Sequence, residues 1–341
     1  MTLLLIGLFV LLLVSITLAI ALGPVEIPFG TVWRIAIEQI SGIDMGEWSK
    51  AQFQIVWYLR FPRVLLGVLV GATLSVVGVA MQAMVRNPLA DPYLLGVSSG
   101  AATGAVLVLF FGVLSSLGVF ALSAGAFTGA MLSLSLVFLL AQHRRNLSPT
   151  RMILAGVAMS YFFSAVTSLL TLVADDYQAA RRALEWMLGG LAGTQWVELT
   201  LPALALVLGT AYLVLQARSL NALLVGEETA RALGVDTTRF RRELFVVMAL
   251  LTGIMVAVSG AIGFVGLMMP HIVRLVVGSD HRRVLPVAAF AGAIFLVWVD
   301  VAARTVIAPQ ELPVGVITAL FGAPFFLWLM RHKADRLRGE R

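Results

Sequence analysis

The segment Gly96-Val-Ser-Ser-Gly100 has the glycine and serine spacing of a serine hydrolase, with Ser98 as the attacking hydroxyl. That chemistry needs a turn between a strand and a helix, and a histidine base. This segment instead opens an apolar helix. The four histidines lie in charged loops, in the C-terminal tail or directly after Pro270: His143, His271, His281 and His332. We therefore do not expect hydrolase chemistry.

Asp300 is the one acidic side chain well inside a long apolar stretch. A carboxylate there could couple proton or sodium movement to transport, as in a secondary transporter. Arg304 follows one helical turn later, at a spacing that lets the two side chains pair. The pair favours a structural role for Asp300, and the coupling role stays as the alternative.

A stripe of small and hydroxyl side chains lies along the predicted helix 152–174. Its members are Gly156, Ser160, Ser164, Ser168 and Thr171. Their spacing of about one turn puts them on a single face. Such a face could line the path of a substrate across a membrane. It could equally allow two helices to pack closely, as small residues do in lipid.

Composition excludes other chemistry. The chain has no cysteine, which removes disulfides, thiolate metal sites and cysteine catalysis. Its lysines, Lys50 and Lys333, stand outside any glycine-rich phosphate loop, so the chain is not a P-loop ATPase. The net charge of +6 is spread over loops without interleaved aromatics, which argues against nucleic acid. We expect no cofactor and no metal in this chain.

The elements that position these residues are membrane helices. Of the 341 residues, 60% are hydrophobic and 12% are charged, which is too apolar for a soluble fold. A spanning helix needs about 20 apolar residues, and we predict about ten in one all-α transmembrane domain over residues 1–341. The predicted spans are 3–22, 61–84, 93–111, 117–141, 152–174, 197–217, 243–261, 266–278, 284–303 and 313–330. Because no Lys or Arg precedes it, the first is predicted to be an uncleaved helix.

Two predicted spans, 93–111 and 266–278, are short and rich in glycine, and Pro270 is expected to break the second. Either could enter the membrane without crossing it. Elsewhere, glycines four residues apart predict close packing of helices in lipid, as at Gly125 and Gly129.

The basic residues select an orientation. If the N-terminus is cytoplasmic, all but seven of the 24 Lys and Arg residues fall on the cytoplasmic side. The seven are Arg34, Lys50, Arg60, Arg63, Arg181, Arg182 and Arg304. The positive-inside rule therefore places both termini inside. We expect a multi-pass protein of the bacterial inner membrane, in contact with lipid.

Two loops could bind partners. The longest cytoplasmic loop, 218–242, alternates leucines with charged residues, as two short amphipathic helices do. It could contact a separate ATPase or lie on the bilayer surface. On the outer side, Arg60-Phe-Pro-Arg63 opens the second span, with Pro62 suited to the first turn of a helix. These arginines could bind a partner or anchor to lipid headgroups.

Six segments, in chain order, resemble the cobalamin and iron-chelate permease family of binding-protein-dependent ABC importers. They are RFPR (60–63), GVAMQAMVRNPLADPYLLGVSSGA (78–101), LSPTRMILAG (147–156), LLVGEETARALGV (223–235), SGAIGFVGLMMPHIVRLVVGSDHRR (259–283) and ELPVGVITALFGAPFF (311–326). The resemblance implies a homodimer with the path at the subunit interface. It also implies two ATPase subunits that bind ATP and Mg on the cytoplasmic side, and a periplasmic substrate-binding protein outside.

The resemblance further implies roles for individual residues. Docking of the binding protein falls to Arg60, Arg63 and Arg304. The cytoplasmic gate falls to Asn87, Leu89, Ser148 and Thr150. Coupling to the ATPase falls to Leu223, Gly226, Glu227, Glu228, Ala230, Leu233 and Gly234. An iron chelate, haem or a ferric siderophore, is the favoured substrate because such systems are the commoner members of the family, and cobalamin is the alternative.

Overall fold

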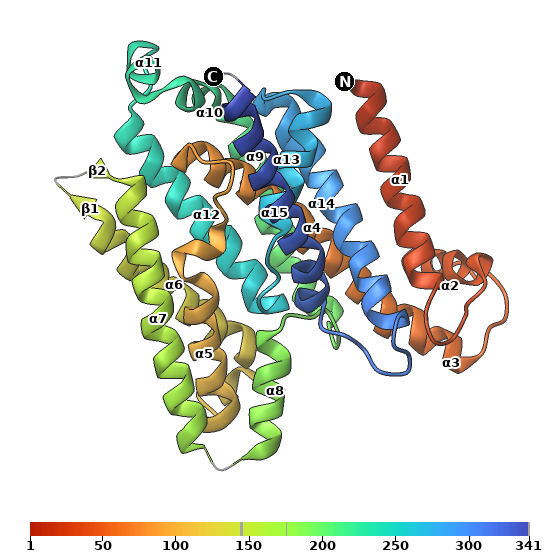
Figure 1. Cartoon of the computed structure of the whole chain (residues 1–341). Helices are drawn as coiled ribbons and strands as arrows, with labels where there is room; N and C mark the ends of the chain where they lie inside the picture. Colours follow the sequence, from red (N-terminus) through yellow and green to blue (C-terminus); the bar gives the residue numbers. More distant parts are fainter. Residues whose placement is uncertain (144–145, 175, 340–341) are drawn as a thin grey trace.

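The computed structural model describes residues 1–143, 146–174 and 176–339, and the chain is helical over most of them (Figure 1). Arg144, Arg145 and Arg341, which contribute to the predicted charge asymmetry, lie outside the described residues. The helices are α1 (Thr2–Ala21), α2 (Phe29–Ser41), α3 (Lys50–Phe53), α4 (Phe61–Val85), α5 (Val97–Phe111), α6 (Ala121–Ala141), α7 (Pro149–Val173), α8 (Tyr177–Met187), α9 (Thr200–Leu215), α10 (Ala217–Val225), α11 (Glu227–Ala232), α12 (Thr237–Ser259), α13 (Val265–Val277), α14 (His281–Thr305) and α15 (Val314–Gly339).

Shorter elements connect these helices. They are the π-helical turn η1 (Gln54–Arg60), the 3-10 turns η2 (Pro92–Leu95), η3 (Ser115–Phe120) and η4 (Trp196–Leu199), and the paired two-residue strands β1 (Gln142–His143) and β2 (Asn146–Leu147).

The predicted all-α, multi-pass fold is confirmed. Eight helical stretches among the described residues are long and apolar enough to cross a membrane. Two shorter apolar helices, α5 and α13, match the short predicted spans. Helix α1 begins, and α15 ends, at the end of the bundle that holds α10 and α11 (Figure 1). We refer to this as the cytoplasmic end, following the charge distribution, and to the opposite end as the outer end.

The second span is longer than predicted. Helix α3, the π-helical turn η1 and helix α4 form one stretch of 36 residues, Lys50–Val85. Pro62 lies in the first turn of α4, as predicted, but the continuous helical stretch already begins at Lys50. In the π-helical turn, the Phe61 N–H donates to the carbonyl of Val56, five residues back. This wider turn ends just before Pro62, which has no N–H to continue the ladder.

The prediction that Pro270 breaks its helix is wrong, because α13 continues through it. Proline removes the N–H that would bond to the carbonyl four residues earlier, here that of Gly266. The Gln82 side-chain amide on α4 donates to that carbonyl instead, at 3.4 Å. The real interruption precedes α13, where Gly260 and Phe264 have φ of +65° and +68°.

Helix α4 forms the centre of the bundle and is the most deeply buried of the spans. It packs closely against α14, since a Cβ on Gly71 would collide with the backbone of Gly292. Helices α5 and α6 approach in the same way, because a Cβ on Gly100 would lie 2.5 Å from the carbonyl oxygen of Gly129. The predicted small-residue packing is thus confirmed for this pair.

Candidate functional site

A buried charge cluster lies at the outer ends of α4 and α14. Arg63 Nε is 2.8 Å from Asp300 Oδ1, and Arg63 Nη1 is 2.8 Å from Glu311 Oε2. Arg304 Nε lies 3.0 Å from Asp300 Oδ2. Asp300 is 1% exposed, so both of its oxygens face guanidinium groups in a space with little water. The predicted pairing of Asp300 with Arg304 is confirmed, and Arg63 joins it.

Arg60 and Arg304 cap the outer end of α1. The last carbonyls of a helix have no intrahelical partner and attract cations. Arg60 Nη1 donates to the carbonyls of Ile20 and Ala21 at 2.7 and 2.9 Å. Arg304 Nη2 donates to the carbonyl of Ala19 at 2.9 Å. These two side chains therefore connect α1 to α4 and α14.

The three arginines assigned to docking share this cluster and are buried. Arg60, Arg63 and Arg304 are 6%, 8% and 4% exposed. Glu311 is the accessible member, because its side chain is 43% exposed. The docking role stays a prediction. For docking, a carboxylate of the binding protein would have to replace one of the carboxylates or backbone carbonyls of this chain that now bind the arginines.

The hydroxyl stripe of α7 divides between two roles. Ser164 and Ser168 line a pocket of about 230 Å³, whereas the hydroxyls of Ser160 and Thr171 donate to carbonyls of α7 itself at 2.9 and 2.8 Å. Two of the four hydroxyl side chains thus line a cavity, and the other two bond within their own helix.

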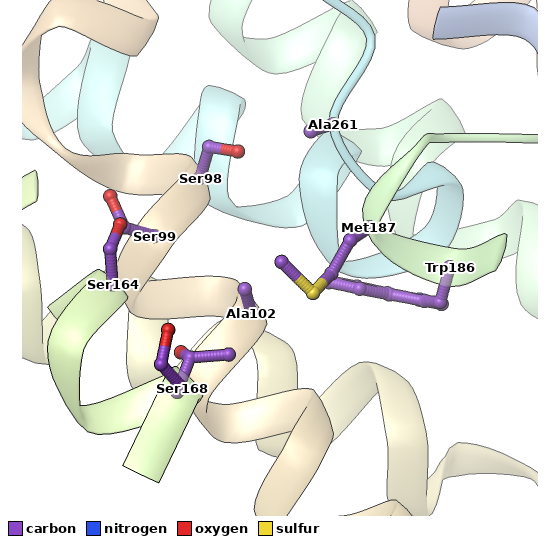
Figure 2. Close-up of a pocket in the computed structure, with 9 residues that line it drawn as sticks. Ser98, Ser99, Ala102, Ser164, Ser168, Trp186, Met187 and Ala261 are labelled. Carbon is purple, nitrogen blue, oxygen red and sulfur yellow. The ribbon is translucent and has the colours of Figure 1, made fainter. Parts of the chain in front are cut away.

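The pocket has two chemically distinct walls (Figure 2). Ser99 of α5 lies beside Ser164 of α7, whereas the Ser98 hydroxyl points towards the side of Ala261, and Trp186 and Met187 at the end of α8 lie across the pocket from the α7 serines. Its lining holds no charged side chain and no histidine. Ser98 therefore has no base among the described residues that line this pocket. Trp186 also borders a second pocket of about 400 Å³ with Arg182 and Glu198.

The predicted cytoplasmic gate falls on two segments. Asn87 Oδ1 accepts a hydrogen bond from the Leu89 N–H at 3.0 Å, which stabilises the turn after α4. Leu89 lines an apolar pocket of about 590 Å³ together with Phe264 and Phe326. In the same turn, burial raises the pKa of the Asp91 carboxyl to about 6. The other gate residues lie at the start of α7, where Ser148 is the N-cap residue and Thr150 is exposed.

The two short helices predicted in the loop 218–242 are present as α10 and α11, and α12 already begins at Thr237. Leu223 and Ala230 are fully buried and attach these helices to the bundle. Glu227 pairs with Arg231 at 2.6 Å and with Arg241 at 3.0 Å. Gly226, with φ of +146°, forms the turn between the two helices.

The outer face of this element is exposed. Glu228, Leu233 and Gly234 face away from the bundle, and Leu233 is 68% exposed. Val225 beside them is 72% exposed. Apolar side chains gathered on a cytoplasmic surface are typical of a protein interface.

Sequence reasoning missed Asn221, which joins α10 to α14. Its Nδ2 donates to Asp280 Oδ1 at 2.7 Å, and its Oδ1 accepts from the His281 N–H at 2.9 Å. The hydrogen bond from Asn221, followed by that from the Arg282 N–H, lowers the pKa of Asp280. Asp280 is a residue type typical of an N-cap and stands shortly before the apolar run that begins at Val284. Its partner lies 59 positions away, where spacing gives no signal.

Known proteins similar to this chain are transport permeases. The FecCD transport family matches residues 11–332. The hemin transport system permease protein HmuU of Yersinia pestis is 40% identical over 340 residues, with 98% of each chain covered. The cobalamin import system permease protein BtuC of Halobacterium salinarum is 44% identical over 310 residues, covering 90% of this chain and 81% of that protein.

A solved structure of an ABC transporter is also similar to this chain. It is described as an inward-facing conformation of a metal-chelate type ABC transporter, and it superposes with a TM-score of 0.83 at 31% identity. The match covers 97% of this chain and 100% of that chain.

Proposed function

Because the chain belongs to the FecCD transport family of ABC importer permeases, we propose that it moves an iron chelate, haem or a ferric siderophore, from periplasm to cytoplasm. The observation that carries this substrate is the 40% identity to a hemin permease over 98% of both chains. Cobalamin is the second candidate, supported by the 44% identity to a cobalamin permease.

Uptake into proteoliposomes tests the substrate. The permease is reconstituted with its ATPase and binding protein, and ATP-driven uptake of haemin, a ferric hydroxamate and cyanocobalamin is compared. Uptake of haemin or the ferric hydroxamate, with no accumulation of cyanocobalamin, is the expected result. Exclusive uptake of cyanocobalamin would replace the iron chelate by the corrinoid and leave the importer function intact.

The proposed assembly contains two copies of this chain, with the path between them, in the bacterial inner membrane. Two ATPase subunits bind ATP and Mg at the cytoplasmic end, and a periplasmic binding protein docks at the outer end. The exposed apolar face of α10 and α11 supports an ATPase contact through Glu228 and Leu233. Large exposed side chains on α7, such as Tyr161 and Leu172, support its position at an interface or facing lipid.

The substrate path is proposed to pass the hydroxyl pocket, with Ser164 and Ser168 in its wall. An uncharged lining with hydroxyls on one side suits a substrate that must be released again, because single hydroxyl contacts are weak. At the inner end, Asn87 and Leu89 on one segment and Ser148 and Thr150 on another form the proposed gate.

The docking proposal centres on Arg63. Arg60 and Arg304 donate to backbone carbonyls of α1, which cannot move away without unwinding that helix end. Arg63 also pairs with Glu311 on an accessible loop, and a carboxylate of the binding protein could take the place of that side chain. The Glu311 side chain is 43% exposed, so solvent weakens its pair with Arg63 and lowers the cost of the exchange.

The secondary-transporter alternative uses Asp300 as a coupling site. Both oxygens of Asp300 lie within 3.0 Å of guanidinium groups, which disfavours binding of a transported cation there. Vesicles that contain this chain alone should therefore show no uptake driven by a pH gradient. Gradient-driven uptake in the absence of an ATPase would establish the alternative.

A further inference from the structure

One polar side chain connects the cytoplasmic helix α10 to the start of the long helix α14. Asn221 donates to Asp280 Oδ1 at 2.7 Å and accepts from the His281 N–H at 2.9 Å. Its Oδ1 is also 2.6 Å from Nδ1 of His281, which is 1% exposed. The neighbours Leu220 and Leu223 are fully buried, and Asn221 and Asp280 are half-buried.

The residue type fits its surroundings closely. Asp280 offers only acceptors, and it also caps α14 by accepting from the Arg282 N–H at 3.1 Å. The His281 backbone offers only a donor. An amide carries a donor and an acceptor in one plane and so satisfies both. An aspartate at 221 would set two carboxylates against each other. An alanine would leave the His281 N–H without its acceptor and would remove one of the two donors to Asp280 Oδ1.

The same helix reaches the opposite end of the molecule. Helix α14 extends from His281 to Thr305, a length of about 37 Å at 1.5 Å per residue. Its first residues bind Asn221, and its last turns carry Asp300 and Arg304 of the outer charge cluster. A displacement of α10 that is passed to the start of α14 would therefore reach the outer cluster through one helix.

We propose that Asn221 is a positioning residue that makes α10 and α14 move as one body. Through it, movement of the ATPase-facing element is transmitted to the outer cluster around Asp300. This inference rests on the proposed contact between α11 and the ATPase. It adds the route by which that contact acts on the membrane domain.

The first test uses the complete complex with ATPase and binding protein. Asn221→Ala should retain basal ATP hydrolysis and lose stimulation by the binding protein by about fivefold or more, a typical coupling between sites. Ser219→Ala is the matched control, because its hydroxyl bonds to Gln216 within the same region and not to α14. Full stimulation in Asn221→Ala, or equal loss in both variants, would overturn the proposal.

A second measurement does not depend on whether Asn221→Ala folds well. The chain has no cysteine, so spin labels can be placed at Arg218→Cys at the start of α10 and at Val306→Cys just after α14, both exposed. In complexes diluted with unlabelled permease, the distance distribution should be the same without nucleotide and with ATP. A shift in the otherwise native protein would show that α10 and α14 move independently, and would overturn the proposal.

The contact with the ATPase and the route through Asn221 can be tested separately. If replacing Glu228 and Leu233 leaves the ATPase bound and coupled, the proposed contact is wrong. If that replacement uncouples transport while Asn221→Ala does not, the contact stands and only the route through Asn221 is overturned.

Discussion

The two ends of this molecule differ in whether their candidate partner-binding side chains are buried or exposed. At the outer end, the arginines that the sequence places at a membrane surface are buried and bound to Asp300, Glu311 and the carbonyls of α1. At the cytoplasmic end, α10 and α11 use Leu223 and Ala230 for attachment and leave Leu233 uncovered.

The difference shows that the outer side chains already have partners within this chain, whereas the cytoplasmic side chains do not yet have a covering surface. Because the arginine side chain is long and flexible, it can form hydrogen bonds with buried carbonyls and carboxylates of its own chain. An apolar side chain on a short surface helix has no such reach, and only another surface can cover it. Substitutions at the outer cluster should therefore act on stability, and substitutions at the coupling element should act on association.

The largest effect is expected at Asp300. Asp300→Asn leaves Arg63 and Arg304 buried without their shared anion, and loss of one partner of a buried pair costs about 3–5 kcal/mol. The free energy or temperature of unfolding in detergent should fall accordingly. Glu185→Gln is the control, since its pair with Arg181 is exposed and contributes about 0–1 kcal/mol. Equal losses in both variants would mean that the cluster is not a structural element.

The coupling element should give the clearest effect on association. Glu228→Ala with Leu233→Ala should weaken binding of the ATPase by about tenfold or more, or uncouple hydrolysis from uptake, as loss of an interface anchor does. The unfolding temperature should stay unchanged, because both side chains face away from the bundle. Leu208→Ala on α9 is the control, being 67% exposed where Leu233 is 68% exposed. Full ATP-driven uptake in the double variant would contradict the contact.

The hydroxyl stripe allows two kinds of position on α7 to be compared, and the expected effect on thiol reactivity is of intermediate size. Single cysteines at Ser164 and Ser168 should react with water-soluble thiol reagents, at rates that differ between nucleotide-free and ATP-bound complexes, because these positions line the pocket. Cysteines at Ser160 and Thr171 should react more slowly, since those side chains point to carbonyls of α7. Four unreactive positions in both states would identify the stripe as packing only.

The smallest effect is expected at Glu311. Glu311→Gln should release Arg63 towards the binding protein and raise its affinity by at most about fivefold, the range of an exposed ion pair. The gain should be largest at low salt, because the charges are screened at higher ionic strength. Arg63→Gln should lower the affinity in the same assay. If neither change alters binding at low salt, these side chains do not meet the partner.

Sequence reasoning recovered most of the fold because the membrane imposes simple rules. Every backbone N–H and C=O in lipid needs an internal partner, so each apolar run of sufficient length becomes a helix. The two short glycine-rich spans were predicted for the same reason, whereas the paired helices of the cytoplasmic loop were predicted from their alternation of leucines with charged residues. The extension of the second span by α3 and η1 was not predicted, because a π-helical turn before Pro62 leaves no sign in the hydropathy.

Composition and order of residues by themselves determined the membrane class, the absence of cysteine chemistry, the predicted orientation and the family resemblance. Only the tertiary structure decided where the long-range polar partners lie. Arg63 meets Asp300 across 237 positions, and Arg304 meets the carbonyl of Ala19 across 285. Such pairs depend on which helix ends become neighbours, and helical spacing reports only on partners within a turn or two. The burial of the predicted docking arginines, and the bond between Asn221 and Asp280, therefore became visible only in the folded chain.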